Sequence, residues 1–481
     1  MPTAATPPAS KPAKTKPVFT TGSTMRHVVT MTVTSSVGLV SVFLVDLLNL
    51  FYISLLGEQF LAAAIGYAAT VMFFTVSVSI GLAIGATAIV SRSLGGGAEE
   101  RAGREATAAL LFVLASTTAL ALVLWPNIEG ALRLVGASGE TLAIAAHFMR
   151  IVVPSVPLLG LGMAFGGLLR ALGDAKRAMY VTLAGAAVAS VLDPLLIFAL
   201  DLGITGAALA TFGTRVTLVA VGLYGTVRVH DLLRRPDGAI LRATLWPYAL
   251  IAGPAVLTQL ATPVGNAYVT ASIARFGDDA VAGWAIVGRV LPVAFGTIFS
   301  LSGAIGAILG QNYGARLWGR VEEALRDALV FALIYVLAAW AVLALGADWI
   351  ASAFDATGEA RDLVVFFCRV VAASFLFNGA LFVSNAAFNN LGNAGYATLF
   401  NWGRATLGVI PFVYVGQAYG AEGVLAGWGL GAVVFGALSV VFAFRTVRRL
   451  PERAAREDAA AAHVPPTANS AFTSGKGAVS G

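Results

Sequence analysis

Two aspartates lie inside long apolar stretches of this sequence, where a charge is costly. Asp46 lies within SVFLVDLLNLFY and Asp193 within ASVLDPLLIF. An ionised side chain at the centre of a membrane-spanning helix costs about 2.5–3.5 kcal/mol. An acid under that penalty can bind and release a proton at physiological pH. The two aspartates therefore indicate an ion- or proton-coupling site.

Pro194 directly follows the second of these acids. A proline inside a helix removes one backbone hydrogen bond and bends the helix, which here frees the carbonyl near Ser190. Asp193 is thus a candidate proton or cation site at a conformational kink; the alternative is a helix bend with an incidental buried acid. For Asp46 the alternative is an acid satisfied by a neighbouring hydroxyl or arginine. If both acids face one cavity, they titrate as a coupled pair.

Five arginines also lie inside apolar stretches: Arg150, Arg215, Arg289, Arg369 and Arg404. Arg150 and Arg369 occupy equivalent positions in an internal repeat, which favours an architectural role. The two aspartates, in contrast, correspond to Asn266 and Phe412 in the second half. A scaffold residue is expected in both halves, whereas an ion site is needed only once. This asymmetry favours function in the N-terminal half.

The elements that must position these side chains are membrane-spanning helices. The chain has 481 residues, of which 58% are hydrophobic and 12% charged, about half the charged fraction of a soluble protein. Apolar runs of about 20 residues recur, without period-two alternation, so helices are favoured over a membrane barrel. The sequence predicts an all-α integral membrane protein with twelve transmembrane helices in two pseudo-symmetric six-helix bundles. Their approximate ranges are 26–55, 61–92, 104–126, 141–170, 177–200, 203–228, 244–275, 280–311, 321–346, 360–390, 395–416 and 420–446.

A repeat with an offset of 219 residues relates the two halves. Ala88-Ile89 and Gly95 match Ala307-Ile308 and Gly314, and Leu172-Gly173-Asp174-Ala175 matches Leu391-Gly392-Asn393-Ala394. Duplicated halves are common in transporters, with the substrate path between them. The sequence predicts a disordered cytoplasmic tail, an N-terminal lobe, a cytoplasmic linker, a C-terminal lobe and a second disordered cytoplasmic tail, over residues 1–24, 25–228, 229–243, 244–450 and 451–481.

The basic residues predict the orientation. Most of them lie in alternate loops on the side of the N-terminus, whereas the opposite loops hold Arg133, Arg275 and Arg361 and are otherwise acidic. Positive loops stay in the cytoplasm, so we expect a multi-pass protein of the cell inner membrane with both termini cytoplasmic. The net charge of +6 is thus explained by the loops that orient the protein in the lipid bilayer, its expected partner. We expect no nucleic-acid partner. We expect a monomer.

Other types of site receive little support. The single cysteine, Cys368, excludes an intrachain disulfide and a multi-cysteine metal site. The four histidines have no metal-ligand spacing, and no nucleophile–base constellation indicates an enzyme. Phe375 is a candidate for an aromatic pocket that binds cations, with core or lipid-facing packing as the alternative. We expect no cofactor and no bound metal apart from the coupling ion.

Several motifs together resemble the multidrug and toxic compound extrusion family over nearly the whole chain, from about residue 25 to residue 450. They are VDLLNLFYISLLG with LAAAIGYA, AIVSRSLGGG, LRALGDAKRAMY, LDPLLIF, AILGQNYGAR and FNNLGNAG. The resemblance implies a V-shaped pair of six-helix bundles that alternates access between the two sides of the membrane. It also implies ion-driven efflux of cationic, often aromatic, compounds.

The resemblance assigns roles to individual residues. Asp46 resembles the family's first-helix acid, Asp193 its fifth-helix acid, and Thr211 the sixth-helix threonine of the N-lobe cation site. Ala189 departs from the pattern, because an asparagine commonly stands there. The C-terminal half has Gln259, Thr262, Asn266 and Asn378 where the sodium-coupled branch carries acids, so its sodium site is not expected. Gln259, Asn266, Asn378 and Phe375 are candidate substrate-cavity residues.

The sequence therefore predicts a secondary antiporter that exports small organic cations in exchange for H+, similar to the branch named for DNA-damage-inducible transporters. One alternative is a Na+-coupled drug antiporter, with Na+ bound at Asp46, Asp193 and Thr211. The other is a lipid-linked or polysaccharide flippase, in which Arg150, Arg289 and Arg369 would hold a phosphate head group.

Overall fold

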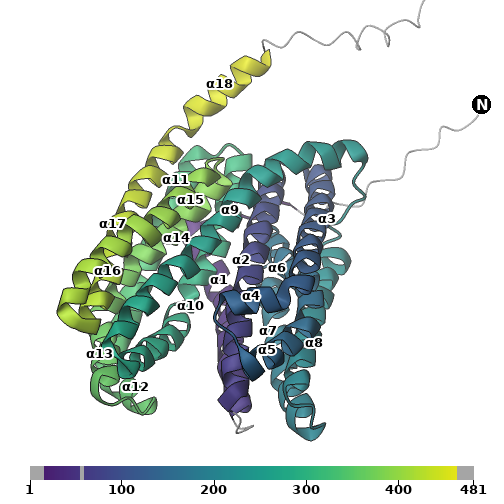
Figure 1. Cartoon of the computed structure of the whole chain (residues 1–481). Helices are drawn as coiled ribbons and strands as arrows, with labels where there is room; N and C mark the ends of the chain where they lie inside the picture. The colour runs from purple at the N-terminus through teal and green to yellow at the C-terminus, as the bar shows by residue number, and fades with distance from the viewer. Residues whose placement is uncertain (1–15, 55–58, 463–481) are drawn as a thin grey trace, which may run out of the picture.

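The computed structural model describes residues 16–54 and 59–462, with the side chain of Asp46 outside the described residues. All elements of this part of the chain are helical (Figure 1). The N-terminal half comprises α1 Thr24–Ser54, α2 Gln59–Gly95, α3 Glu99–Leu124, α4 Ile128–Leu134, α5 Gly139–Val152, α6 Val156–Ala171, α7 Ala175–Pro194 and α8 Gly203–Leu223. The C-terminal half comprises α9 Gly238–Ile273, α10 Asp278–Gly314, α11 Trp318–Leu345, α12 Ala347–Ala353, α13 Gly358–Arg369, α14 Phe375–Asn390, α15 Ala394–Gly403, α16 Ile410–Gly416, α17 Gly420–Arg448 and α18 Leu450–Ala462.

Twelve membrane spans account for the long apolar helices of the described residues. Eleven helical stretches of the described residues are long and apolar enough to cross a membrane, and the last of them, Ala394–Arg448, is 55 residues long. At about 1.5 Å per residue this stretch is more than twice the thickness of a hydrocarbon core. It reverses at Gly420, whose φ of 79° suits glycine, and so contributes two spans. The predicted fold class is confirmed.

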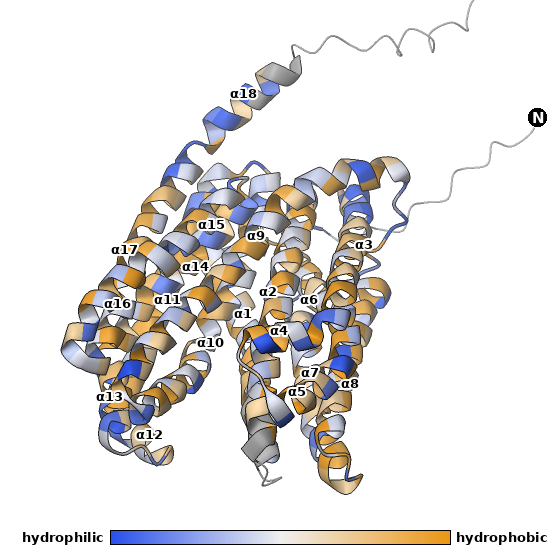
Figure 2. Ribbon diagram, in the orientation of Figure 1, coloured by the Kyte–Doolittle hydropathy of each residue, from blue (hydrophilic) through white to orange (hydrophobic). Residues whose placement is uncertain are grey.

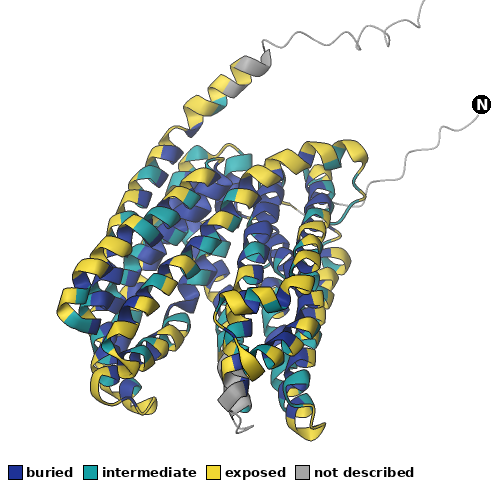
Figure 3. Ribbon diagram, in the orientation of Figure 1, coloured by how far each residue is buried: buried dark blue, intermediate teal, exposed yellow. Residues whose placement is uncertain are grey.

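The helices form two lobes, α1–α8 and α9–α17, whose ribbons spread apart toward the end where α4, α5, α12 and α13 lie (Figure 1). We call this the divergent end, and the opposite end, where residues 16–23 and α18 lie, the tail end. Apolar residues run along the helices, and polar ones gather toward the two ends and on α18 (Figure 2). Buried residues face the interior (Figure 3).

The linker between the lobes is shorter than predicted. The first lobe continues as a π-helical segment to Val229, and α9 begins at Gly238, within the predicted linker 229–243. The Asp237 side chain accepts a hydrogen bond from the Ile240 amide at 2.7 Å. An aspartate that caps the first turn in this way is a recognised helix-start signal. The polar composition of this stretch predicts a linker, but the aspartate cap starts α9 inside it.

The predicted disordered tails need correction where the structure describes them. Residues 451–462 are helical, as part of α18. At the N-terminus, Phe19 is 1% exposed. Its amide donates to Gln311 Oε1 at 2.9 Å, and its carbonyl accepts from Arg320 Nη2 at 3.0 Å. Because one apolar side chain is buried and its backbone is satisfied, this segment is ordered despite its polar composition.

Candidate functional site

Asp193 of α7 is 2% exposed and lies at the interface with α8. A Cβ on Gly213 would lie 2.8 Å from Leu192 Cδ1, and one on Gly206 would lie 2.6 Å from the Leu196 backbone. These two contacts define the register of the antiparallel pair. They place Thr211 at about the level of Asp193, within one helical turn. The Thr211 hydroxyl donates to the Ala207 carbonyl at 3.0 Å.

The backbone of α1 brings position 46 to the same level. A Cβ on Gly38 would lie 2.1 Å from Thr182 Oγ1, and the rings of Tyr52 and Phe198 meet edge to face with centroids 6.1 Å apart. Both contacts run in the same chain direction, so α1 and α7 are parallel. Position 46 lies between these two contacts along α1. It is therefore within about one helical turn of Asp193, roughly 5 Å along the helix axis.

The α-helical hydrogen bonding of α7 ends at Pro194, and the chain continues as a π-helical segment, Leu195–Ala199. Because the proline nitrogen has no hydrogen to donate, the Ser190 carbonyl loses its usual partner. The Ser190 hydroxyl donates to the Ala186 carbonyl, one turn earlier, at 3.0 Å. π-Helical insertions are frequent at functional sites. Asp193 thus lies at a change in helix type.

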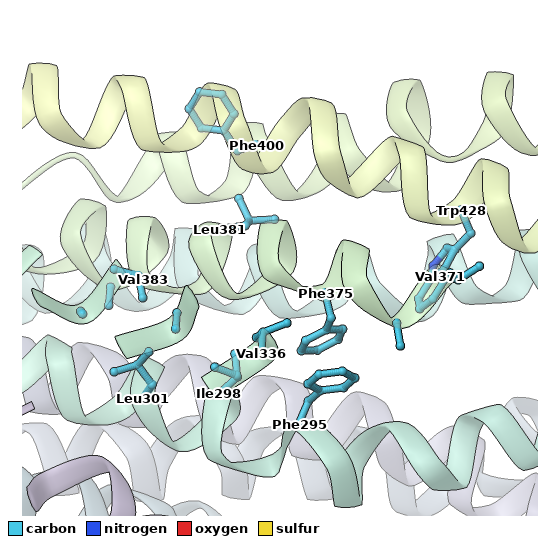
Figure 4. Packing of buried hydrophobic residues seen from close by; sticks show 14 of the residues in the cluster. Phe295, Ile298, Leu301, Val336, Val371, Phe375, Leu381, Val383, Phe400 and Trp428 are labelled. Carbon is cyan, nitrogen blue, oxygen red and sulfur yellow. The ribbon is translucent and has the colours of Figure 1, made fainter. Parts of the chain in front are cut away.

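The candidate cavity residues of the C-terminal lobe fall into different environments. Asn266 is exposed on α9, Gln259 is half-buried on the same helix, and Asn378 is buried on α14. Phe375 is buried and stacks on Phe295 with ring centroids 4.1 Å apart (Figure 4). This packing favours the alternative interpretation of Phe375, a core aromatic residue.

Arg150 and Arg369 have equivalent partners in the two lobes. Arg150 pairs with Glu129 at 2.8 Å and Arg369 with Asp348 at 2.5 Å, and the two acids are themselves 219 residues apart. In each lobe a tryptophan indole also donates to the carbonyl of the arginine. Both pairs connect neighbouring helices, which agrees with an architectural role. The sequence indicated the two arginines, but their partners only became evident from the structure.

Two further arginines are buried inside the lobes. Arg215 donates to Ser155 Oγ at 2.8 Å and to the Val152 carbonyl at 3.2 Å, so it supports the connection between α5 and α6. Arg404 is 6% exposed. Its Nη2 lies 3.5 Å from Thr262 Oγ1, and its Nε has no hydrogen-bond partner among the described residues. The Nε–H group of Arg404 can therefore donate a hydrogen bond to a further polar or anionic group.

At the tail end, α2 and α10 cross with almost no space between them. A Cβ on Gly95 would lie 1.9 Å from the Gln311 carbonyl oxygen, and one on Gly314 would lie 1.9 Å from the Arg92 carbonyl oxygen. The two glycines are the repeat partners found in the sequence. Because neither has a side chain, the backbones can touch. The crossing closes the tail end.

Polar contacts strengthen this closure. Arg92 of the first lobe donates to the carbonyls of Asn389 and Asn390 of the second, at 3.0 Å each. Gln311, which holds Phe19, also donates to the Ala171 carbonyl of the first lobe at 2.7 Å. The N-terminal segment thus lies against the contact between the lobes and is bound to it. We call these contacts and the α2–α10 crossing the tail-end gate.

Asp174 organises the loop before α7, outside the membrane spans. It accepts hydrogen bonds from the Arg177 amide at 3.0 Å, from Arg177 Nη1 at 2.5 Å and from His230 Nε2 at 2.7 Å. Burial raises the pKa of Asp174, but the hydrogen bonds from His230 and Arg177 outweigh burial and hold this pKa well below its usual range. Asp174 thereby ties the start of α7 to the end of the first lobe.

We expect the Asp174→Asn variant to unfold at a lower temperature than the wild type at pH 7. A carboxyl whose pKa is depressed in the folded state stabilises the fold above its unfolded pKa, about 3.9, and loses that effect as the pH falls further. The difference between the two proteins should therefore shrink below about pH 4. Thermal unfolding in detergent at several pH values measures this difference in unfolding temperature. The control is Glu323→Gln, which removes an exposed acid at the same end. A constant difference at all pH values would contradict this expectation.

Comparisons with known proteins cover most of the chain. The MatE family model matches residues 34–195 and 254–415. A FAD transporter of Shewanella oneidensis is 29% identical over 411 residues, 83% of this chain and 90% of its own length. The multidrug export protein MepA of Staphylococcus aureus is 25% identical over 397 residues, 80% of this chain and 85% of its own length. An outward-facing structure of a multidrug resistance MATE family transporter superposes with a TM-score of 0.86 at 21% identity, covering 92% of this chain and 100% of that one.

Proposed function

Because the chain belongs to the MatE family, we propose that it exports organic cations in exchange for H+, with Asp193 and Asp46 as the coupling acids. It is a membrane transporter and not an enzyme. The observation that carries the proposal is the burial of Asp193 at 2% exposure, at the level of Thr211 and of position 46. A buried acid responds to protonation with a large change in electrostatic free energy, so proton binding can drive a conformational change.

The tail end faces the cytoplasm in this proposal, and the protein lies in the inner membrane. Arg92, Arg177 and Arg320 lie at this end, whereas the arginines Arg150 and Arg369 of the divergent end are paired with Glu129 and Asp348. This distribution agrees with the rule that positive loops stay inside. With the tail-end gate closed, the described conformation is outward-facing. Uptake of cytoplasmic substrate then requires the α2–α10 crossing to open.

Cation export is favoured by the buried acid and by the relative that is named a multidrug export protein. H+ coupling follows from the proton-coupled branch that the sequence resembles. Na+ coupling is the alternative, because the side chains of Asp193 and Thr211 carry oxygen atoms at one level, where the backbone of position 46 also lies. In the proposal Asp193 and Asp46 exchange protons, and no metal ion is bound.

A second candidate cargo is an organic anion, which one observation favours. Arg404 is buried with an unpartnered Nε, and one relative is named a FAD transporter. FAD carries a diphosphate, which guanidinium groups recognise by charge-assisted hydrogen bonds. The flippase alternative has less support, since Arg150 and Arg369 are engaged in ion pairs.

The test is transport into inverted vesicles with an imposed pH or Na+ gradient. We expect an acidic lumen to drive uptake of a fluorescent organic cation, and Asp46→Asn to abolish that uptake, because asparagine cannot exchange a proton. Na+-driven uptake that does not depend on pH would overturn the proton assignment. If the wild type takes up FAD and not the cation, and Arg404→Gln loses the uptake of FAD, the cargo is an organic anion and not an organic cation.

A further inference from the structure

Arg289 is an intramembrane arginine without an acidic partner among the described residues. It lies on α10, and its side chain is exposed. It makes no hydrogen bond or ion pair with another residue of the described ranges. An arginine within an apolar span is costly unless a partner or water satisfies it. Its guanidinium is therefore open to a partner other than the described residues.

Arg289 lines a cavity of about 630 Å3 between α10, α11 and α12. Leu44 of α1 closes one side, so the cavity lies where the first lobe meets the second. The Tyr335 hydroxyl in its wall already donates to the Ala294 carbonyl at 2.9 Å. Among the described residues that line it, Arg289 carries the single charge, and most of the others are apolar. The volume is within the range of about 300–1,000 Å3 of ligand sites.

The cavity lies toward the divergent end, against α12. Trp349 of α12 lines it and is 75% exposed, and Val342 of α11 is 70% exposed. Tryptophans are enriched where hydrocarbon meets head groups. Arginine side chains extend toward the same level. The apolar wall therefore faces the acyl region, while the guanidinium can reach the head-group region.

We propose that this cavity binds an anionic phospholipid of the bilayer, with an acyl chain in the apolar part and the phosphate on Arg289. Guanidinium and phosphate form two parallel charge-assisted hydrogen bonds. A zwitterionic lipid offers the same phosphate, but its own ammonium group competes for it. An exported organic cation is repelled by Arg289. The positive charge of Arg289 in the cavity wall thus favours an anionic lipid over a zwitterionic lipid or an organic cation.

The bound lipid contacts the helix that carries one of the coupling acids. Leu44 lies two positions before Asp46 on α1, and α1 also packs on α10, where a Cβ on Gly296 would lie 3.1 Å from Val40. An acyl chain against Leu44 stabilises α1 in its described position. Binding itself does not depend on what the protein transports, so it can be tested separately from transport.

The experiment uses the full-length protein in vesicles that contain brominated phosphatidylglycerol or brominated phosphatidylcholine. The fluorescence difference between the wild type and Trp349→Phe isolates the emission of Trp349. We expect brominated phosphatidylglycerol to quench this emission at a mole fraction about five-fold lower than brominated phosphatidylcholine, the ratio that corresponds to one basic residue at a membrane surface. In Arg289→Gln we expect the two lipids to quench equally.

Two variants complete the test. Arg275→Gln removes an exposed positive charge that donates to Gln417 outside the cavity, and it should keep the five-fold preference. Ala339→Phe fills the cavity and should weaken quenching by both lipids. Equal quenching by both lipids in the wild type, an unchanged preference in Arg289→Gln, or unchanged quenching in Ala339→Phe would each overturn the proposal.

Discussion

Replacing Asp193 with asparagine is expected to reduce pH-driven transport to the background rate of vesicles without the protein. Asparagine has nearly the same size and can still form hydrogen bonds, so the packing between α7 and α8 should persist. It cannot bind and release a proton, so the step that couples the gradient to the conformational change is lost. The initial rate of cation uptake into inverted vesicles with an acidic lumen measures the effect.

The matched control for this prediction is Asp201→Asn. Asp201 follows the same span but is exposed, and its φ of 51° is a conformation that asparagine tolerates well. The control should transport at the wild-type rate. Retained pH-driven transport in Asp193→Asn, with a normal unfolding temperature, would show that Asp193 is not a coupling acid.

Replacing Gly95 with alanine is expected to open the tail-end gate. The added Cβ would lie 1.9 Å from the Gln311 carbonyl oxygen, whereas real Cβ atoms essentially never approach within 3.0 Å. Because the obstacle is backbone, α2 and α10 must move apart, and the conformation with the closed tail end is destabilised. We expect transport to fall by more than about ten-fold, which corresponds to about 1.4 kcal/mol. Gly314→Ala should have the same effect, since its environment is the repeat equivalent.

A cysteine introduced at position 91 reports the opening directly. Ser91 is fully buried, and its hydroxyl lies 2.0 Å from where a Cβ on Gly310 would be. In a Cys368→Ser background, Ser91→Cys should be unreactive toward a membrane-impermeant maleimide and become reactive when Gly95 is alanine. Gly319→Ala is the control, because nothing lies within 4 Å of its Cβ position. If the Gly95→Ala variant leaves the introduced thiol unreactive and transport undiminished, the gate is refuted.

The tail-end gate is formed by equivalent positions of the sequence repeat. Gly95 and Gly314 match at the fixed offset of 219 residues. In the structure each glycine lies against the residue that precedes its repeat partner by three positions, Gln311 and Arg92. A pair of positions related by pseudo-symmetry and in mutual contact must lie near the symmetry axis. The axis therefore passes close to this crossing, where the lobes meet.

The sequence by itself determined the twelve spans and the two halves, and it predicts Asp46 and Asp193 as the coupling acids. The physical reason is that lipid imposes local rules. Each span must be long, apolar and internally hydrogen-bonded, and a charge inside it is conspicuous. These properties can be determined from a window of about 20 residues, without knowledge of distant contacts. The MatE family match agrees with the motifs in the same stretches.

Only the tertiary structure decided which distant groups meet. Phe19 belongs to a polar, proline-rich segment, and its burial depends on Gln311 and Arg320, which are 292 and 301 residues away in the chain. Arg150, Arg289 and Arg369 are alike as intramembrane arginines in the sequence, yet two have acidic partners and Arg289 faces an apolar cavity. Hydropathy depends on each residue alone, whereas pairing depends on how the helices pack. The roles of the charges therefore emerge only when the lobes are assembled.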